Sequence, residues 1–145
     1  MKGLIAIFVS GVMLAAPAFS DEVTEFSIDD VITSVRAKEA LQDDIAFSYA
    51  GQKYSASANI LLEATALQAI NGFLKSDRNA CELAFIAVMT ELKSIAIANG
   101  GNALVDIRSS LSAESVERED GTYGCISKTT VAEVSLTASV AILAD

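Results

Sequence analysis

Residues 76–99 restrict the choice of fold more than any other part of the chain. Apolar side chains recur there every three or four positions, which is the spacing of one face of an α-helix. Ser76 is a typical N-cap residue, and Asp77 places a negative charge where the helix dipole favours it. We therefore expect one long helix that is buried over much of its circumference. Its apolar face consists of Cys81, Phe85, Val88, Leu92 and Ile95, widened by Leu83, Ile86, Met89 and Ala96.

Two adjacent glycines, Gly100 and Gly101, follow this helical segment directly. A residue just past a helix often adopts a left-handed conformation that only glycine or asparagine takes at low cost, so we predict that these glycines form the helix C-cap. A phosphate-binding loop has the opposite order of strand, glycine turn and helix, which directs free amide groups at the anion. No G-x-x-x-x-G-K-[ST] motif occurs either. The sequence therefore excludes nucleotide binding by a known loop type.

Three segments have the patterns of strands. Residues 45–50 (IAFSYA) alternate and run into a turn-like Gly-Gln-Lys, and residues 103–107 follow the two glycines. Residues 130–143 alternate over their whole length, which predicts a half-buried antiparallel strand. One face of that strand would carry Val134, Leu136, Ala138, Val140 and Ile142, and the other face Glu133, Ser135, Thr137 and Ser139.

The remaining segments are less regular. Residues 27–41 predict one or two short helices, with Ser27 as N-cap and Asp29 and Asp30 in the first turn. Residues 54–73 are compatible with strands at 60–62 and 66–70 or with a helix, and residues 111–124 predict an acidic hairpin loop. The predicted fold class is α+β, with one long helix packed on a mostly antiparallel sheet.

The first 20 residues predict a secretory signal peptide. Lys2 precedes an apolar run at residues 4–16, and Ala18-Phe19-Ser20 forms a small-x-small site, so we expect cleavage between Ser20 and Asp21. The apolar run is shorter than the ~20 residues that a membrane helix needs, which argues against a retained anchor. No cysteine lies near the cut to carry a lipid. We expect one domain, residues 21–145, that is exported to the periplasm without a membrane span.

The charge of the chain restricts its partners. There are 10 Lys and Arg residues against 19 Asp and Glu residues, a formal net charge of −9. Loss of Lys2 with the signal peptide would add one more negative charge. Such a surface repels nucleic-acid phosphates and anionic lipid headgroups, because binding to either requires neutralisation by Lys and Arg. We expect an envelope protein as the partner, and neither nucleic acid nor nucleotide.

Cys81 and Cys125 are the only cysteines. Export would place them in a compartment where disulfides form and persist, so we predict a bridge from the first turns of the long helix to the start of the last strand. The alternative is a redox-active or metal-binding pair. It would require Cys-x-x-Cys spacing or a nearby histidine, and the chain contains no histidine.

The sequence gives little support for a catalytic nucleophile, a pair of catalytic carboxylates or a calcium site. After the signal peptide there is no G-x-S-x-G or S-x-x-K motif for a nucleophile. Adjacent carboxylates at 29–30, 43–44 and 119–120 are typical of caps and turns, although a glycosidase would need two that face each other. Four acidic residues could bind calcium but lack the order of a dedicated loop, so we interpret them as a solvated hairpin. They are Glu114, Glu117, Glu119 and Asp120. We predict no catalytic, cofactor-binding or metal-binding residue.

The run from Cys81 to Ser110, followed by Tyr123-Gly-Cys125 and the alternating strand to Leu143, resembles a family of small exported proteobacterial proteins. Members are often labelled "excinuclease ATPase subunit". The resemblance covers residues 76–143, and its most specific parts are G-G-N-A-[LV]-V-[DN]-I and the two cysteines. That label does not fit this chain, which lacks an ATPase loop and zinc ligands.

The order of cysteine, helix, G-x-N-A, strand, cysteine and strand is also similar to the C-terminal domain of the Rcs outer-membrane stress-sensor lipoprotein. Small cytoplasmic domains named "heavy-metal-binding" share it. The resemblance implies a β-α-β-β core with Cys81 bridged to Cys125, and no catalytic residue. The lipid-bearing cysteine and proline-rich spacer of the stress sensor are missing here.

The sequence therefore leads us to expect a non-enzymatic periplasmic module that binds or senses an envelope component. The alternative is a small acidic ion-binding or hydrolase-like protein. The two differ in geometry: two carboxylates facing each other in a deep cleft would favour the alternative. An exposed strand edge or apolar patch would favour the binding module.

Intact mass spectrometry of the exported protein tests the processing and the disulfide together. We expect a mass that starts at Asp21 and no reaction with a thiol-alkylating reagent until the protein is reduced, because both cysteines are bridged. A retained leader, or alkylation of the native protein, would contradict these predictions.

Overall fold

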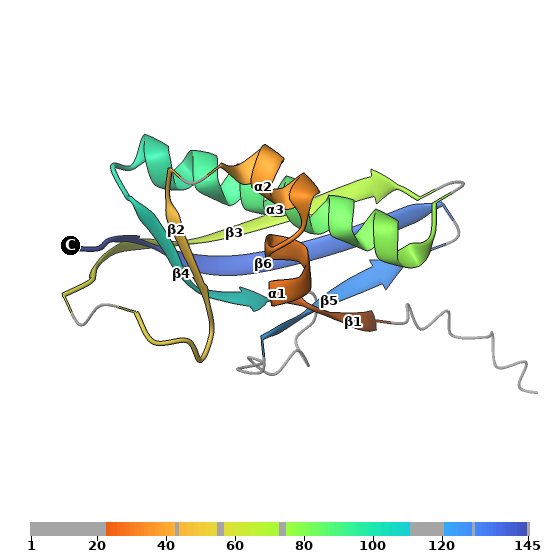
Figure 1. Cartoon of the computed structure of the whole chain (residues 1–145), viewed down its shortest axis with the longest axis horizontal. Coiled ribbons are helices and arrows are strands. Elements are labelled where there is room, and N and C mark those ends of the chain that lie inside the picture. The colour runs from red at the N-terminus through yellow and green to blue at the C-terminus, as the bar shows by residue number, and fades with distance from the viewer. Residues whose placement is uncertain are drawn as a thin grey trace, which may run out of the picture.

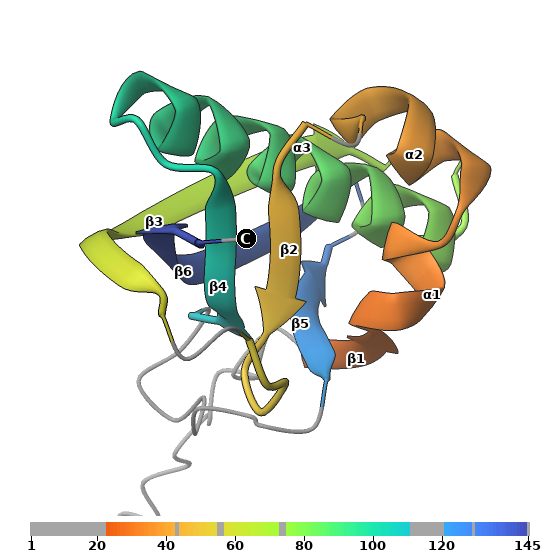
Figure 2. The same ribbon diagram turned by 60° about the vertical axis from the view of Figure 1, so that its left-hand side comes forward.

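The computed structural model describes residues 23–42, 44–54, 57–72, 75–110, 121–128 and 130–144. In this part of the chain a curled mixed sheet is covered on one face by a long helix, as Figures 1 and 2 show. The fold is therefore α+β, as predicted. The elements in chain order are β1 (Val23–Ser27), α1 (Ile28–Ile32), α2 (Val35–Leu41), β2 (Ala46–Tyr49), β3 (Asn59–Asn71), α3 (Asp77–Ala98), β4 (Ala103–Ser109), β5 (Thr122–Ser127) and β6 (Val131–Ile142).

Strand β6 is the centre of the sheet. On one side it pairs antiparallel with β3 along its whole length, from Asn59 opposite Ile142 to Asn71 opposite Val131. On the other side its C-terminal half pairs with β4 and its N-terminal end with β5, both antiparallel. Strand β1 extends the sheet beyond β5, and β2 runs parallel to β4. All strand pairs of the described sheet except β2–β4 are antiparallel.

Helix α3 lies across β3 and β6 and supplies much of the core (Figure 2). The predicted N-cap is confirmed, because the Ser76 side chain accepts a hydrogen bond from the Asn79 amide. Phe85, Val88 and Leu92 on the predicted apolar face are fully buried, whereas Ile95 is partly exposed. They pack with the inward residues of β6, which are Val134, Leu136, Ala138 and Val140.

The helix ends in a glycine turn that starts β4. The C-cap residue is Asn99, one position earlier than predicted, and the two glycines follow it. Gly100 adopts the left-handed conformation with φ +79°, and the Gly101 amide donates to the carbonyl of Ala96 at 2.9 Å. This is a Schellman motif. Gly101 is also needed for packing, because a Cβ there would lie 2.6 Å from a methyl group of Val140.

A β-bulge interrupts β4 at Asp106. This residue has φ +53°, and the register with β6 shifts between Val105 and Arg108. Leu104 and Ile107 therefore both face the main core, although they are three residues apart, whereas Val105 packs in a second small cluster. The sequence analysis predicted a strand at 103–107 without this bulge and two residues shorter than β4.

Several other predictions need correction. Strand β6 is not half-buried: Ser135 and Thr137 are 5% and 6% exposed, and their hydroxyls pair with those of Ser110 and Thr65, each at 2.8 Å. Ile142, expected in the core, is 40% exposed. The hairpin loop predicted at 111–124 includes the first residues of β5, while residues 111–120 lie outside the described part. Residues 54–73 contain a single strand, β3, and β1 was not predicted.

The predicted disulfide joins Cys81 in α3 to Cys125, with an S–S distance of 2.09 Å and both residues fully buried. Cys125 lies in the middle of β5, not at the start of the last strand. The position matters because β5 shares only two residue pairs with β6, Ile126–Glu133 and Ser127–Ala132. The covalent bond therefore holds β5, and β1 beside it, against the helix.

Removal of the Cys81–Cys125 disulfide should destabilise β5 and β1 more than the other strands. The bond spans 44 residues, and closing a loop of that length stabilises by about 4 kcal/mol in the chain-entropy model. We expect the double variant Cys81→Ala/Cys125→Ala to lose stability of that order in urea unfolding. Amide exchange should accelerate more in β5 and β1 than in β3. Equal acceleration in all three strands would contradict the local role of the bond.

Candidate functional site

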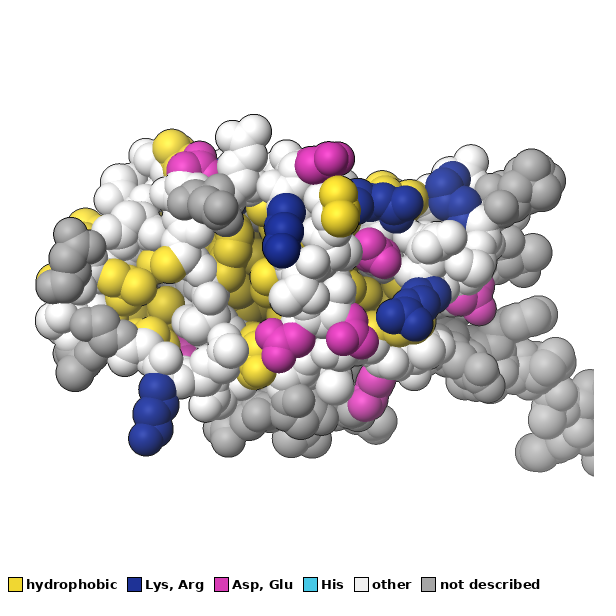
Figure 3. All heavy atoms as spheres, in the orientation of Figure 1, with side chains coloured by type: hydrophobic (Ala, Val, Ile, Leu, Met, Phe, Trp, Pro, Cys, Tyr) yellow, Lys and Arg dark blue, Asp and Glu magenta, His cyan; other side chains and the backbone are white. Residues whose placement is uncertain are grey.

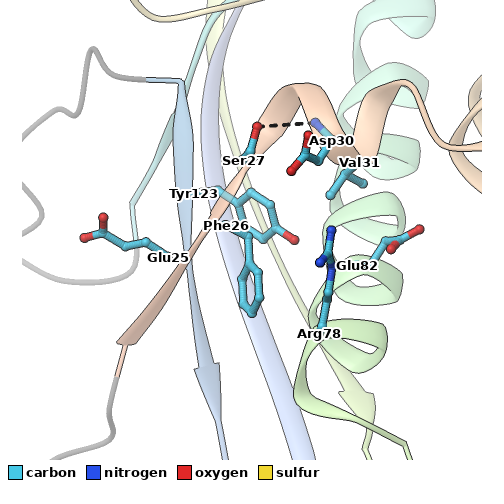
Figure 4. A pocket seen from close by; sticks show the side chains of 8 residues that line it. All are labelled: Glu25, Phe26, Ser27, Asp30, Val31, Arg78, Glu82 and Tyr123. Atoms are coloured by element: carbon cyan, nitrogen blue, oxygen red, sulfur yellow. Dashed lines mark hydrogen bonds between the residues drawn. The ribbon is translucent and has the colours of Figure 1, made fainter.

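A pocket of about 220 Å³ lies where β1, α1, α3 and β5 meet. We call it the Tyr123 pocket. Figure 4 shows that its side chains come from separate parts of the chain: the end of β1, the start of α1, the first turns of α3 and the start of β5. It is lined by Glu25, Phe26, Ser27, Asp30, Val31, Arg78, Glu82 and Tyr123.

Tyr123 forms the buried wall of this pocket. It is 1% exposed, and its ring packs on Phe85 and Phe26 with centroid distances of 4.4 Å and 5.8 Å. Its hydroxyl points towards the space beside α3, where Arg78 and Glu82 lie (Figure 4). Within the described ranges, no hydrogen bond joins this hydroxyl to another residue. The ring of Tyr123 is therefore buried, whereas its hydroxyl borders the pocket. Among the described residues, the buried side-chain polar atom without a hydrogen-bond partner is Ser48 Oγ.

Charged groups surround the hydroxyl. Burial raises the pKa of Tyr123 well above its ordinary value, the negative charge of Glu82 raises it further, and the positive charge of Arg78 opposes the shift. Arg78 and Glu82 are four residues apart on α3, yet neither forms an ion pair with any side chain of the described chain. Their polar groups are therefore open to the pocket.

Local hydrogen bonds fix the other walls. The Ser27 side chain caps α1 by accepting from the Asp30 amide at 3.3 Å, as the sequence predicted. The Ile28 amide donates to the Gly121 carbonyl at 2.9 Å, which joins the start of α1 to the residue before β5. The Cys81–Cys125 bond lies next to Glu82 in sequence and two residues from Tyr123. The disulfide therefore sets the separation of α3 and β5 at the pocket.

The residues singled out from the sequence are not brought together at this pocket. Asp30 lines it, while Asp29 accepts a hydrogen bond from the Tyr49 hydroxyl at 3.3 Å. Asp44 pairs with Lys93, whose hydrogen bond lowers the pKa of Asp44. Asp43 and the acidic residues Glu114, Glu117, Glu119 and Asp120 lie outside the described residues, as do Ser20 and Asp21.

Among the residues with described positions, no group of three or more acidic, histidine or cysteine side chains could hold a metal ion. In that same part of the chain, no helix is both long and apolar enough to span a membrane.

Sequence reasoning missed the pocket. Its residues come from four segments, and only the position of Tyr123 two residues before a bridged cysteine links two of them.

The surface carries a second feature, the outer edge of β3. This strand pairs with β6 on one side and with no strand of the described chain on the other. Its exposed apolar side chains include Leu67 at 52% and Ile60 at 46%. Figure 3 shows hydrophobic side chains at the surface near the end of the molecule that carries the C-terminus, and charged ones gathered mainly over α1, β1 and the start of α3.

Comparison of this chain with known proteins gives a distant structural similarity. No protein-family model matches the chain, and no curated protein matches it. Among solved structures it is similar to a crystal structure, at 2.73 Å resolution, of a protein of unknown function in the DUF74 family from Pediococcus pentosaceus. The TM-score is 0.48 at 14% sequence identity, with 69% of this chain and 98% of that chain covered. A match at this level carries no functional argument.

The buried hydroxyl of Tyr123 should make the protein sensitive to alkaline pH. Its folded-state pKa is raised above the value near 10 of an unfolded chain, so its contribution to stability is complete below pH 10 and is lost as pH rises beyond that. We expect Tyr123→Phe to reduce the loss of unfolding free energy between pH 8 and pH 11. Tyr54, which is 37% exposed, provides the comparison. The negative charge of Asp106 raises the pKa of Tyr54 as well, but the hydroxyl is not buried, so Tyr54→Phe should change this loss less. Equal effects of the two variants would contradict the assignment.

Proposed function

We propose that this protein is a non-enzymatic binding module of the periplasm that docks on an envelope protein through the outer edge of β3. The observation that supports the proposal most is the edge itself. It belongs to the longest strand, Asn59–Asn71, and no described strand covers it.

An uncovered edge presents a row of backbone N–H and C=O groups that can pair with another strand. Natural proteins usually protect such edges with lysine, proline or a bulge. Strand β3 contains no Lys, Arg or Pro, and its single bulge lies near the start, between Ile60 and Leu62. Its one charged residue, Glu63, is bound to the guanidinium of Arg108 at 2.8 Å. The rest of the edge thus lacks protection from strand addition.

The exposed side chains of β3 suit recognition by strand addition. In this mode, backbone hydrogen bonds give affinity and alternate side chains give specificity. Leu67 is more than half exposed in the middle of the strand, and Ile60 and Leu61 are exposed at its start. A partner with a free strand and an apolar side chain facing Leu67 would bury these groups.

Two features support a location outside the cytoplasm. Residues 1–20 have the pattern of a signal peptide, although they lie outside the described residues. The disulfide is typical of an oxidising compartment. The non-enzymatic assignment rests on the sequence, which has no histidine and no nucleophile motif. In the structure, Asp44 and Glu63 are engaged in ion pairs.

Site-specific photocrosslinking in the native organism tests the docking surface. A photoreactive residue in place of Leu67 should give a crosslink to one envelope protein, mapped to a single strand of that partner. The same residue at Val35, which is 72% exposed on α2, should not. We expect Leu67→Lys, tested with the crosslinker at Ile60, to reduce the yield about tenfold without changing the melting temperature, because it places a charge in the contact. Val35→Lys should leave the yield unchanged.

Some outcomes would overturn the proposal. Equal crosslinking from Leu67 and Val35 would mean that the edge is not the contact. Crosslinks only to a second copy of this chain would show that the edge serves self-association.

A further inference from the structure

We infer that the Tyr123 pocket binds a small molecule that carries both an ammonium and a carboxylate group, such as a free amino acid. The inference concerns a different surface from the edge of β3 and does not depend on it. It rests on the size of the pocket, on the Tyr123 hydroxyl that borders it and on the charged side chains of Arg78, Asp30 and Glu82 that line it.

The size of the pocket limits the ligand. Its volume is about 220 Å³. Pockets for drug-sized ligands have volumes of about 300–1,000 Å³. The ligand is therefore smaller than a typical drug or nucleotide. Phe26 and Val31 provide apolar wall for a short side chain or carbon skeleton.

Two hydrogen-bond donors converge on the pocket. The Tyr123 hydroxyl, on a residue that is 99% buried, is directed into the space that the Arg78 guanidinium also reaches (Figure 4). Both groups line the same pocket, and Figure 4 shows the guanidinium beside the hydroxyl. A carboxylate fits both donors, because guanidinium groups bind carboxylates with paired, charge-assisted hydrogen bonds.

The same pocket carries an excess of hydrogen-bond acceptors. Asp30 and Glu82 lie on the α1 and α3 walls beside Arg78, whereas the Glu25 carboxylate points away from them (Figure 4). Beside Arg78 there are therefore two negative charges and one positive charge. An ammonium group that donates to Asp30 and Glu82 would offset part of this excess.

Neither charge alone suits this arrangement. A simple anion at Arg78 would be repelled by Asp30 and Glu82, and a simple cation at Asp30 and Glu82 would be repelled by Arg78. A zwitterion places each of its charges beside the opposite one. The charge pattern thus favours a molecule with both groups on neighbouring atoms.

A titration followed by NMR tests this inference on the purified, oxidised protein. The probes are L-leucine, isoamylamine, which lacks the carboxylate, and isocaproate, which lacks the ammonium group. We expect L-leucine to shift the ring signals of Tyr123 saturably. Each of the other two should bind about tenfold more weakly or less, since each loses one set of charge-assisted hydrogen bonds. Glycine should shift the same signals, because it carries the same two groups.

Two variants separate binding from folding. Arg78→Gln should weaken L-leucine binding about tenfold and abolish its advantage over isoamylamine. Arg36→Gln on α2, which is also exposed, is the matched control and should leave both affinities unchanged. Tyr123→Phe keeps the ring contacts with Phe85 but removes one donor. Followed through the backbone amide signals of Arg78 and Glu82, it should weaken the binding of L-leucine and isocaproate and leave that of isoamylamine unchanged.

The inference is overturned if neither L-leucine nor glycine shifts the Tyr123 signals. It is also overturned if isoamylamine or isocaproate binds as tightly as L-leucine, or if Arg36→Gln weakens binding as much as Arg78→Gln. A loss of the folded spectrum in Arg78→Gln would leave Tyr123→Phe to decide, through the difference between isocaproate and isoamylamine.

Discussion

The covalent bond between Cys81 and Cys125 fixes the relation of the long helix to the weakly paired end of the sheet. Strand β3 is held to β6 over its full length, whereas β5 shares two residue pairs with β6 and otherwise borders β1. Besides these pairs, the Gly124 amide of β5 donates to the Ser109 hydroxyl of β4 at 3.1 Å, so the ladder that holds β5 and β1 is much shorter than that of β3. The disulfide fixes β5 against the first turns of α3, and the stack of Tyr123 on Phe85 then excludes water from the contact.

The same bond links the core to the pocket. Arg78 and Glu82 flank Cys81 on α3, and Tyr123 precedes Cys125 by two residues on β5. Side chains two residues apart on a strand lie on the same face, so Tyr123 and Cys125 both point at the helix. Cys125, which forms the stabilising disulfide, and Tyr123, which lines the pocket, therefore lie in the same short segment of β5. The β3 edge is built differently, because it depends on the long ladder to β6 and not on the disulfide.

The sequence predicted the elements whose pattern is local. Helix α3 was clear because its period, its N-cap and the glycines after it all agree. Strand β3 was ambiguous, because Ala, Leu, Glu and Gln favour helices and its strand state depends on the twelve residue pairs with β6. Strands β1 and β5 are short and do not alternate. The bulge at Asp106 reverses the alternation of β4, and the pocket joins four distant segments, so neither could be recognised from spacing.

The central place of β6 has a consequence for how the protein reaches its fold. This strand contacts β3, β4 and β5 and carries the inward apolar residues against α3, yet it is the last element in the sequence. Most of its contacts join residues far apart in the chain, and contacts of this kind form slowly because loop closure costs entropy before they stabilise anything. Synthesis of residues 131–142 must therefore precede completion of the core. Until then the chain lacks the strand with which β3, β4 and β5 pair.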